Sequence, residues 1–257
     1  RKWPDSMCKA VRAGGPEEQN RIARESDMTK PIIASKRHRP QGLDILYEDR
    51  DIMVVDKVPG LLTIATDKKE NHTAYSRLMD YVRKGNLKCR NRIFIVHRLD
   101  RDVSGIMVFA KTGVAKECLQ SHWEETEKKY LAVVHGQMER PSGTISTYLA
   151  ENQAHVMYST TDPQKGKLSH TAYRVLKETK EFSLLEIRLL TGGKKQIRVH
   201  LSESGQPIVG DKKYGGKDRQ HTRLALRAYS LSFTHPYNGN PLTFETRIPG
   251  YFVKLMD

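Results

Sequence analysis

Short apolar runs joined by short polar connections are the feature of this chain that most constrains its fold. In the first half of the chain they include residues 45–47, 52–55, 93–96 and 105–110. Runs of this length are typical of buried strands. A parallel crossover needs about a dozen residues or more, and most connections here are shorter, so neighbouring strands should be antiparallel.

The rest of the chain continues this pattern. We predict strands at 130–134, 143–149, 168–176, 182–190, 224–233 and 242–247, and extended chain at 61–64. We predict a helix at 73–84, with Tyr75, Leu78, Met79 and Val82 on one face at helical spacing, and a second helix at 114–127. A short helix is predicted at 194–202, ended by Gly205. Strands outnumber helices, which predicts an α+β fold with a mostly antiparallel mixed β-sheet and flanking helices.

Residues 1–40 differ from the remainder in composition. They carry ten Lys/Arg against five Asp/Glu and few aliphatic residues. The favoured interpretation is a basic, poorly ordered N-terminal arm. The alternative is an arm that helps to hold RNA through the basic cluster at 36–39. Residues 41–257 are predicted to form one catalytic domain.

The composition narrows the classes of protein and partner. Lys and Arg outnumber Asp and Glu by 44 to 30, a formal net charge of +14, which attracts polyanions. No apolar run approaches the roughly 18 residues of a membrane span, so no membrane partner is expected. Three widely spaced cysteines indicate reduced thiols and a cytoplasmic protein. No HExxH or zinc-finger pattern is present, so no metal is expected.

The loop at 97–104 lies between two apolar runs and carries most of the candidate chemistry. Asp100 has His97 and Arg98 before it and Arg101 after it. Nearby cations favour the ionised form of a carboxylate, which can act as a nucleophile or a base. The charge pattern alone favours the simpler interpretation, a surface turn with solvated salt bridges.

The full segment at 97–112, HRLDRDVSGIMVFAKT, closely resembles the signature of the RluA-type family of pseudouridine synthases. Val103 stands where the family usually has Thr. The strand KKYLAVVHG at 128–136 resembles the one that supplies the family's active-site tyrosine. The element TGGKKQIRVHL at 191–201 resembles the family's Gly-Arg-x-His-Gln-Ile-Arg-x-His, with Gly193-Lys194-Lys195 in place of Arg-x-His, and residues 207–215 resemble the next loop.

The resemblance implies a pseudouridine synthase fold with a catalytic cleft. It also implies an enzyme that isomerises uridine in structured rRNA or tRNA without a metal or organic cofactor. By resemblance Asp100 is the essential carboxylate, and attack on the sugar, attack on the base and a glycal route all stay open. Arg198 would pair with Asp100 and keep it ionised. Tyr130 would stack on the uracil, and its hydroxyl could serve in proton transfer.

A uridine inside folded RNA must be flipped out to be reached. Arg98 would fill the vacated stack or, alternatively, brace the loop. His97 and His200 are expected to be structural, and Leu201 could pack on the base or in the core. The residues expected to contact RNA are Arg98, Arg101, Lys194, Lys195, Lys212 and Lys213.

Two other functions compete with this one. The same fold could serve a non-catalytic RNA-binding or ribosome-assembly protein, although intact Asp100, Tyr130 and Arg198 argue against that. A nucleoside hydrolase or base-excising enzyme could also use an Asp near C1′. The small RNA-binding domain that many relatives carry is not recognised in residues 1–40. We expect a monomer whose partner is RNA.

Overall fold

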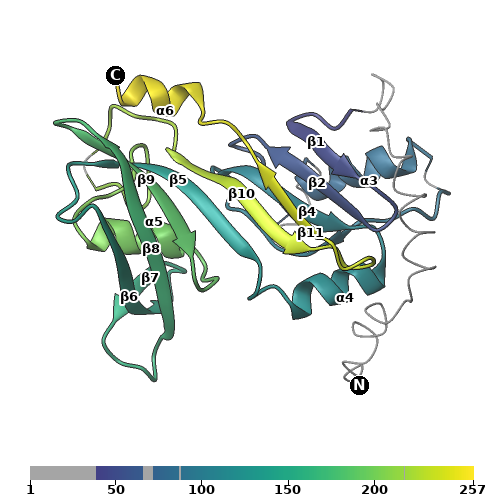
Figure 1. Cartoon of the computed structure of the whole chain (residues 1–257), viewed down its shortest axis with the longest axis horizontal. Coiled ribbons are helices and arrows are strands. Elements are labelled where there is room, and N and C mark those ends of the chain that lie inside the picture. The colour runs from purple at the N-terminus through teal and green to yellow at the C-terminus, as the bar shows by residue number, and fades with distance from the viewer. Residues whose placement is uncertain (1–38, 66–71, 87, 217) are drawn as a thin grey trace. The chain divides into compact units, whose positions relative to one another are not determined.

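The structure is a computed structural model that describes residues 39–65, 72–86, 88–216 and 218–257 (Figure 1). The predicted N-terminal arm, apart from its last two residues, lies outside the described residues. The chain divides into two compact units, and each is treated by itself. Unit 1 holds the described residues up to Leu99, Met107–Thr126 and Ser232–Thr243; unit 2 holds Asp100–Ile106, Glu127–Leu231 and Phe244–Asp257.

Unit 1 begins with the antiparallel hairpin of β1 (Leu43–Glu48) and β2 (Ile52–Lys57). Its turn forms because Asp49 Oδ1 accepts the backbone N–H groups of Asp51 and Ile52, each at 2.8 Å. The two-residue strand β3 (Phe94–Ile95) pairs antiparallel with β4 (Ser104–Ala110), whose seven residues are all buried.

Helix α3 (Ala74–Arg83) shows why the predicted boundaries at 73–84 were accurate. Thr73 caps its first turn by accepting from Ser76 N, while Ser76 Oγ accepts from Thr73 N in a capping box. Lys84 ends the helix in the left-handed conformation. The predicted face was partly wrong: Leu78 and Val82 are buried, but Ala74 and Tyr81 complete that face in place of Tyr75 and Met79.

Three predictions in unit 1 were too long. Residues 61–64 form no strand and make only an isolated bridge from Leu62 to Thr73. In the run at 93–96, strand pairing is confined to β3, because the chain pairs with β4 at only two positions before it turns. The helix predicted at 114–127 is α4 (Gly113–Ser121), because the next strand already begins at Glu127.

Unit 2 is built mainly from antiparallel strands (Figure 1). They are β5 (Glu127–His135), β6 (Ser142–Glu151), β7 (Met157–Thr160), β8 (Lys167–Glu178), β9 (Phe182–Leu189) and most of β10 (Leu226–Thr234). Strand β11 (Pro241–Glu245) has its first three residues in unit 1 and its last two in unit 2. Their order is β10-β5-β9-β8-β6-β7, and β11 pairs with β10. The exception in direction is β10, which runs parallel to the start of β4.

Two short helices belong to unit 2. Helix α5 (Gln196–Glu203) contacts β6, β7 and β8, and α6 (Gly250–Leu255) follows Pro249. The prediction placed the start of α5 two residues early, because Lys195 adopts a left-handed conformation (φ +54°) outside the helix. Strand β7 and helix α6 were not predicted.

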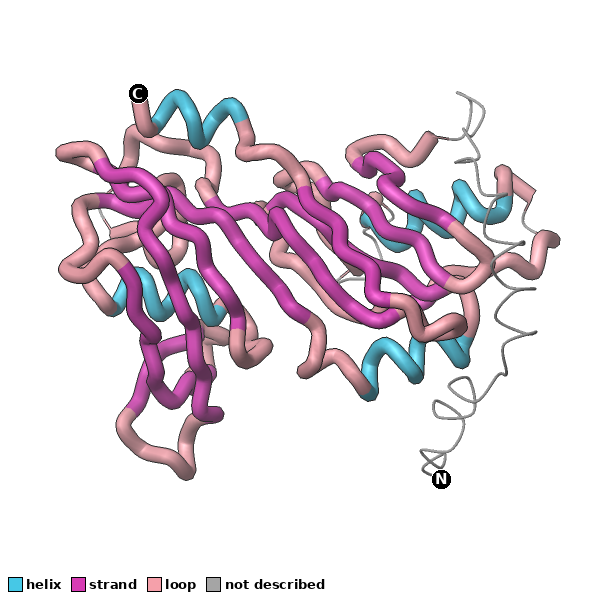
Figure 2. Tube along the Cα trace, in the orientation of Figure 1, coloured by secondary structure: helices cyan, strands magenta, loops and turns pink. Residues whose placement is uncertain are grey.

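The described residues therefore form an α+β fold with mostly antiparallel strands, as predicted. Figure 2 shows that more of the chain lies in strands than in helices. No helix in the described part of the chain is long and apolar enough to cross a membrane. Cys89 and Cys118 form no disulfide bond with any described residue, and Cys8 lies outside the described residues.

Candidate active site

The loop that carries Asp100 is held by a tight turn and a buried anchor. The backbone N–H of Val103 donates to Asp100 O at 3.2 Å, and the Val103 side chain is only 3% exposed. The replacement of Thr by Val therefore falls on a packing position. The Asp100 side chain is 32% exposed, so it is fixed at its base and open to a ligand.

Arg198 forms the ion pair that was expected from the sequence. Its Nη1 donates to Asp100 Oδ2 at 2.9 Å, although the two residues are 98 positions apart. Oδ1 of Asp100 accepts no hydrogen bond from the residues that the structure describes. One carboxylate oxygen is thus held by the guanidinium while the other is available to react.

Gln196 fixes the start of the helix that presents Arg198. Its Oε1 accepts from Gly193 N at 2.9 Å and from Thr191 Oγ1 at 3.1 Å. Its Nε2 donates to His170 O at 3.0 Å and to Thr171 Oγ1 at 2.9 Å. Because this buried amide is fully paired, α5 has a defined position on β8 without a conventional cap.

Asp211 is a site residue to which sequence reasoning assigned no role. Arg198 donates to it through two nitrogens, Nε to Oδ2 and Nη2 to Oδ1, both at 2.7 Å. The Asp211 side chain is fully buried, and Oδ1 also accepts from the backbone of Lys213 and Tyr214 at 2.9 Å. The signal available in the sequence was an acid within a basic, Gly-rich loop.

These contacts set the charge states around Arg198. Burial alone would lower the pKa of Arg198, but the hydrogen bonds and charge of Asp211, followed by those of Asp100, raise it above its usual range. Burial opposes ionisation of Asp211, yet Arg198 and the backbone N–H groups hold its pKa below the usual value. Arg198 is therefore a permanent cation that the Asp211 carboxylate orients toward the Asp100 carboxylate.

Two tyrosines adjoin this ion-pair chain. Tyr130 lies in β5 opposite Ile187 of β9, and burial of its hydroxyl followed by the negative charge of Asp100 raises its pKa. The hydroxyl consequently stays protonated at neutral pH. The Arg198 guanidinium lies 5.3 Å from the centre of the Tyr214 ring, a cation–π contact. The structure thus brings Asp100, Tyr130 and Arg198 together; their roles stay predictions.

The residues predicted to bind RNA lie in different settings. Arg98, Arg101, Lys212 and Lys213 are exposed. Lys194 is already ion-paired with Glu151. Lys195 is half-buried, and burial followed by the like charge of Lys213 lowers its pKa while Asp100 opposes the shift.

The two histidines of the motifs were interpreted as structural, and their contacts agree. His97 Nε2 accepts from Val108 N at 3.1 Å, and its ring stacks on Trp123 at 4.4 Å. His200 bonds to Thr147 and Thr171, and burial lowers its pKa to about 4. Leu201 is fully buried, so of the two positions left open for it the core is correct.

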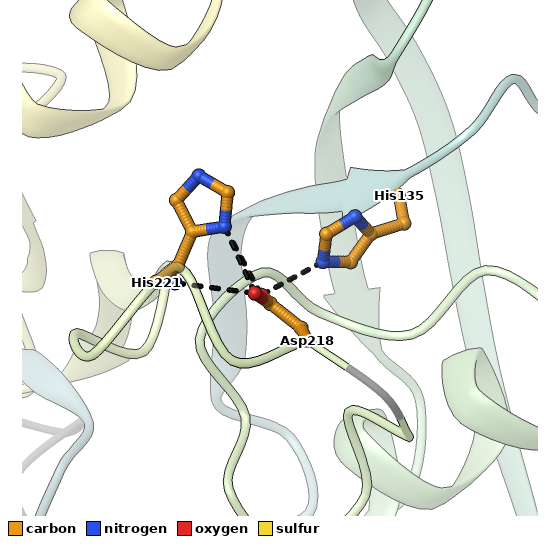
Figure 3. A group of neighbouring side chains, drawn as sticks. All are labelled: His135, Asp218 and His221. Carbon is orange, nitrogen blue, oxygen red and sulfur yellow. Dashed lines mark hydrogen bonds and ion pairs between the residues drawn. The ribbon is translucent and has the colours of Figure 1, made fainter.

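A second polar group lies in the same unit. His135, Asp218 and His221 form the one group among the described residues whose side-chain atoms could hold a metal ion (Figure 3). Asp218 lies between the two imidazoles and bonds to both.

Comparisons with known proteins give the family. The family model for RNA pseudouridylate synthase matches residues 51–203, more than half of the chain, and this range contains Asp100, Tyr130 and Arg198. An uncharacterized RNA pseudouridine synthase of Bacillus subtilis is 32% identical over 234 residues, which cover 90% of this chain and 80% of that protein. Ribosomal large subunit pseudouridine synthase D of Yersinia pestis is 33% identical over 233 residues, 84% of this chain and 70% of its own length.

A solved structure agrees on the fold. The structure of human RNA pseudouridylate synthase domain containing 1 aligns with a TM-score of 0.67 and 26% identity, covering 88% of this chain and 89% of the human one. With the motif at 97–112, the model match and these relatives in agreement, the chain belongs to the RluA-type family of RNA pseudouridine synthases and is an enzyme.

Proposed function

We propose that this enzyme isomerises a flipped uridine in structured ribosomal RNA, with Asp100, Arg198 and Tyr130 as its reactive set. The observation that carries the proposal is the Asp100 carboxylate, half of which is held by Arg198 at 2.9 Å while its other oxygen is left open. The reaction breaks the N1–C1′ bond, rotates the uracil and joins C5 to C1′; C5 loses its proton and N1 gains one, either the same proton or one from solvent. No atom is gained or lost, so no cosubstrate is consumed.

Asp100 supplies the anion in this scheme. Its open oxygen attacks the sugar or the base, or assists elimination to a glycal; the three routes share the need for a carboxylate at this position. Arg198 keeps that carboxylate oriented, because the bidentate contact with Asp211 prevents the guanidinium from turning away.

Tyr130 is proposed to stack on the uracil and to donate a proton. An aromatic ring suits every base face. The Tyr130 hydroxyl carries a proton at neutral pH, and its raised pKa makes it a weak acid, so the proton would pass to a strongly basic atom of the rearranging base. Arg98, exposed and two residues before Asp100, is proposed to fill the stack that the uridine leaves. Arg101, Lys194, Lys195, Lys212 and Lys213 are proposed to contact phosphates.

Ribosomal RNA is favoured over transfer RNA because the relative from Yersinia pestis is named for the large ribosomal subunit. We further propose a monomer in the cytoplasm; that compartment suits Cys89 and Cys118, which form no disulfide bond with any described residue. Transfer RNA remains the second candidate substrate.

The test is pseudouridine mapping of ribosomal and transfer RNA in a deletion strain. The strain is complemented with the wild type or with Asp100→Asn. We expect one or a few sites in ribosomal RNA to disappear and to return with the wild type only. Sites lost from transfer RNA alone would correct the substrate. Sites restored equally by Asp100→Asn would contradict the role of Asp100. Tight RNA binding by the wild type without product would favour a non-catalytic RNA-binding protein.

A further inference from the structure

The group of His135, Asp218 and His221 has no role in the proposed chemistry, yet it is closely organised (Figure 3). The Asp218 side chain is only 4% exposed. Its Oδ2 lies 2.9 Å from His135 Nε2, at the end of β5, and its Oδ1 lies 3.1 Å from His221 Nδ1. The two imidazoles are partly exposed and hold the carboxylate from different sides.

Backbone groups complete the surroundings of this carboxylate. Oδ2 also accepts from Gly210 N at 2.9 Å, and Oδ1 accepts from Gln220 N and His221 N, both at 3.1 Å. An ionised carboxylate offers about four lone-pair sites, and five donors already converge on this one. A cation would have to displace several of them. The geometry is therefore that of a hydrogen-bonded clamp rather than of a preformed metal site.

The backbone segment that Asp218 binds, at Gly210, leads directly into the candidate active site. Gly210 directly precedes Asp211, which holds Arg198. Gly210 has φ +73°, and a Cβ there would lie 2.1 Å from Arg223 O, so the backbone is locked against its neighbour. His135 N also donates to Pro207 O at 2.9 Å, which ties the segment to the strand that bears Tyr130.

We propose that Asp218, held by His135 and His221, is a positioning residue that fixes the Gly210–Asp211 backbone and through it the direction of the Arg198 guanidinium. This inference rests on the proposed roles of Asp100 and Arg198. Asp218 touches neither of them. It acts through a chain of contacts from the Gly210 amide to Asp211, Arg198 and Asp100.

The test compares Asp218→Asn with a matched control, Asp162→Asn. Asp162 lies in the same unit and likewise accepts a backbone N–H, from Gln164 at 2.9 Å, but in an exposed turn. We expect Asp218→Asn to lower kcat about tenfold or more, since a charge-assisted hydrogen bond is lost, with the KM for RNA within about twofold. Asp162→Asn should match the wild type. Asp218→Asn with unchanged kcat would overturn the proposal.

A double-mutant cycle separates positioning from general stability. If Asp218 acts through Asp211, adding Asp218→Asn to Asp211→Asn should lower kcat by less than about twofold further, because the two residues share one path. Fully multiplicative losses would contradict the inference. A wild type that makes no pseudouridine would refute the proposed function itself, whereas an active wild type with an unaffected Asp218→Asn would refute only this inference.

Two further measurements keep the inference testable if Asp218→Asn is unstable. His135→Leu removes one donor at a partly exposed side chain, and we expect about a threefold or larger loss of kcat that His135→Gln, which can still donate, restores. Equal kcat for both variants would contradict the clamp. Activity should also survive a transition-metal chelator; loss that added Zn²⁺ reverses would identify a metal site and overturn the proposal.

Discussion

Replacement of Asp211 by Asn probes how Arg198 is oriented. Arg198 makes two hydrogen bonds to Asp211 at 2.7 Å and one to Asp100 at 2.9 Å. Asn keeps one acceptor but turns an NH₂ group toward the guanidinium, so about one charge-assisted bond, worth about 1.5–3 kcal/mol, is lost. If that loss falls on the transition state, kcat drops about 10- to 150-fold, at about 1.36 kcal/mol for each factor of ten.

The assay is release of tritium from RNA labelled at uracil C5, followed under saturating and subsaturating RNA. We expect the loss in kcat with little change in KM, because Asp211 is fully buried and makes no contact with RNA in the proposed site. Thermal unfolding and the Asp162→Asn control show whether the fold is retained. A folded Asp211→Asn enzyme with wild-type kcat would refute the claim that Asp211 positions Arg198.

Three further outcomes follow from the geometry. His200 is 1% exposed, and burial lowers its pKa from 6.5 to about 4, so as the pH falls the unfolded state binds a proton before the folded state does. Up to about 3 kcal/mol of the free energy of unfolding should therefore be lost between pH 6.5 and 4. An equally steep loss in the His200→Gln variant would contradict this. Tyr130→Ala should weaken RNA binding by about 1–3 kcal/mol, because the stacking ring is lost. Tyr130→Phe should keep the RNA affinity and lower kcat about 100-fold. A Tyr130→Phe variant with full kcat would exclude proton transfer by the hydroxyl. Replacing exposed Lys212 and Lys213 by Ala should reduce the slope of log affinity against log salt by about 1.4–1.8, as salt titration would show, and an unchanged slope would mean that neither contacts phosphate.

Periodicity predicted much of the fold because it acts over a few residues. The run at 105–110 became the buried strand β4, and Thr73 and Lys84 marked the ends of α3. The misses have local causes too. Strand β7 has four residues, of which only Met157 is buried, so it carries no apolar signal. The start of α5 depends on the backbone of Lys195 and on the paired amide of Gln196.

The candidate site was predictable only in part. Asp100, Tyr130 and Arg198 lie in motifs that resemble the family's, and the 2.9 Å ion pair between Asp100 and Arg198 agrees with the expectation. Asp211 lies in the loop at 207–215 that also resembles the family's, but it was assigned no role, and Asp218 lies outside these motifs. Their partners are set by how a Gly-rich loop folds back on β5 and α5, and nothing in the local pattern shows which cation or amide a lone acid will meet.

The central claim is that Asp100 performs the chemistry, and single-turnover tritium release by Asp100→Asn tests it most directly. Asn keeps the size of the side chain and an acceptor for Arg198 but removes the charge. We expect the rate to fall by about 10³-fold or more, while thermal unfolding and RNA affinity stay close to those of the wild type. Turnover within tenfold of the wild type by a folded Asp100→Asn protein would contradict the claim.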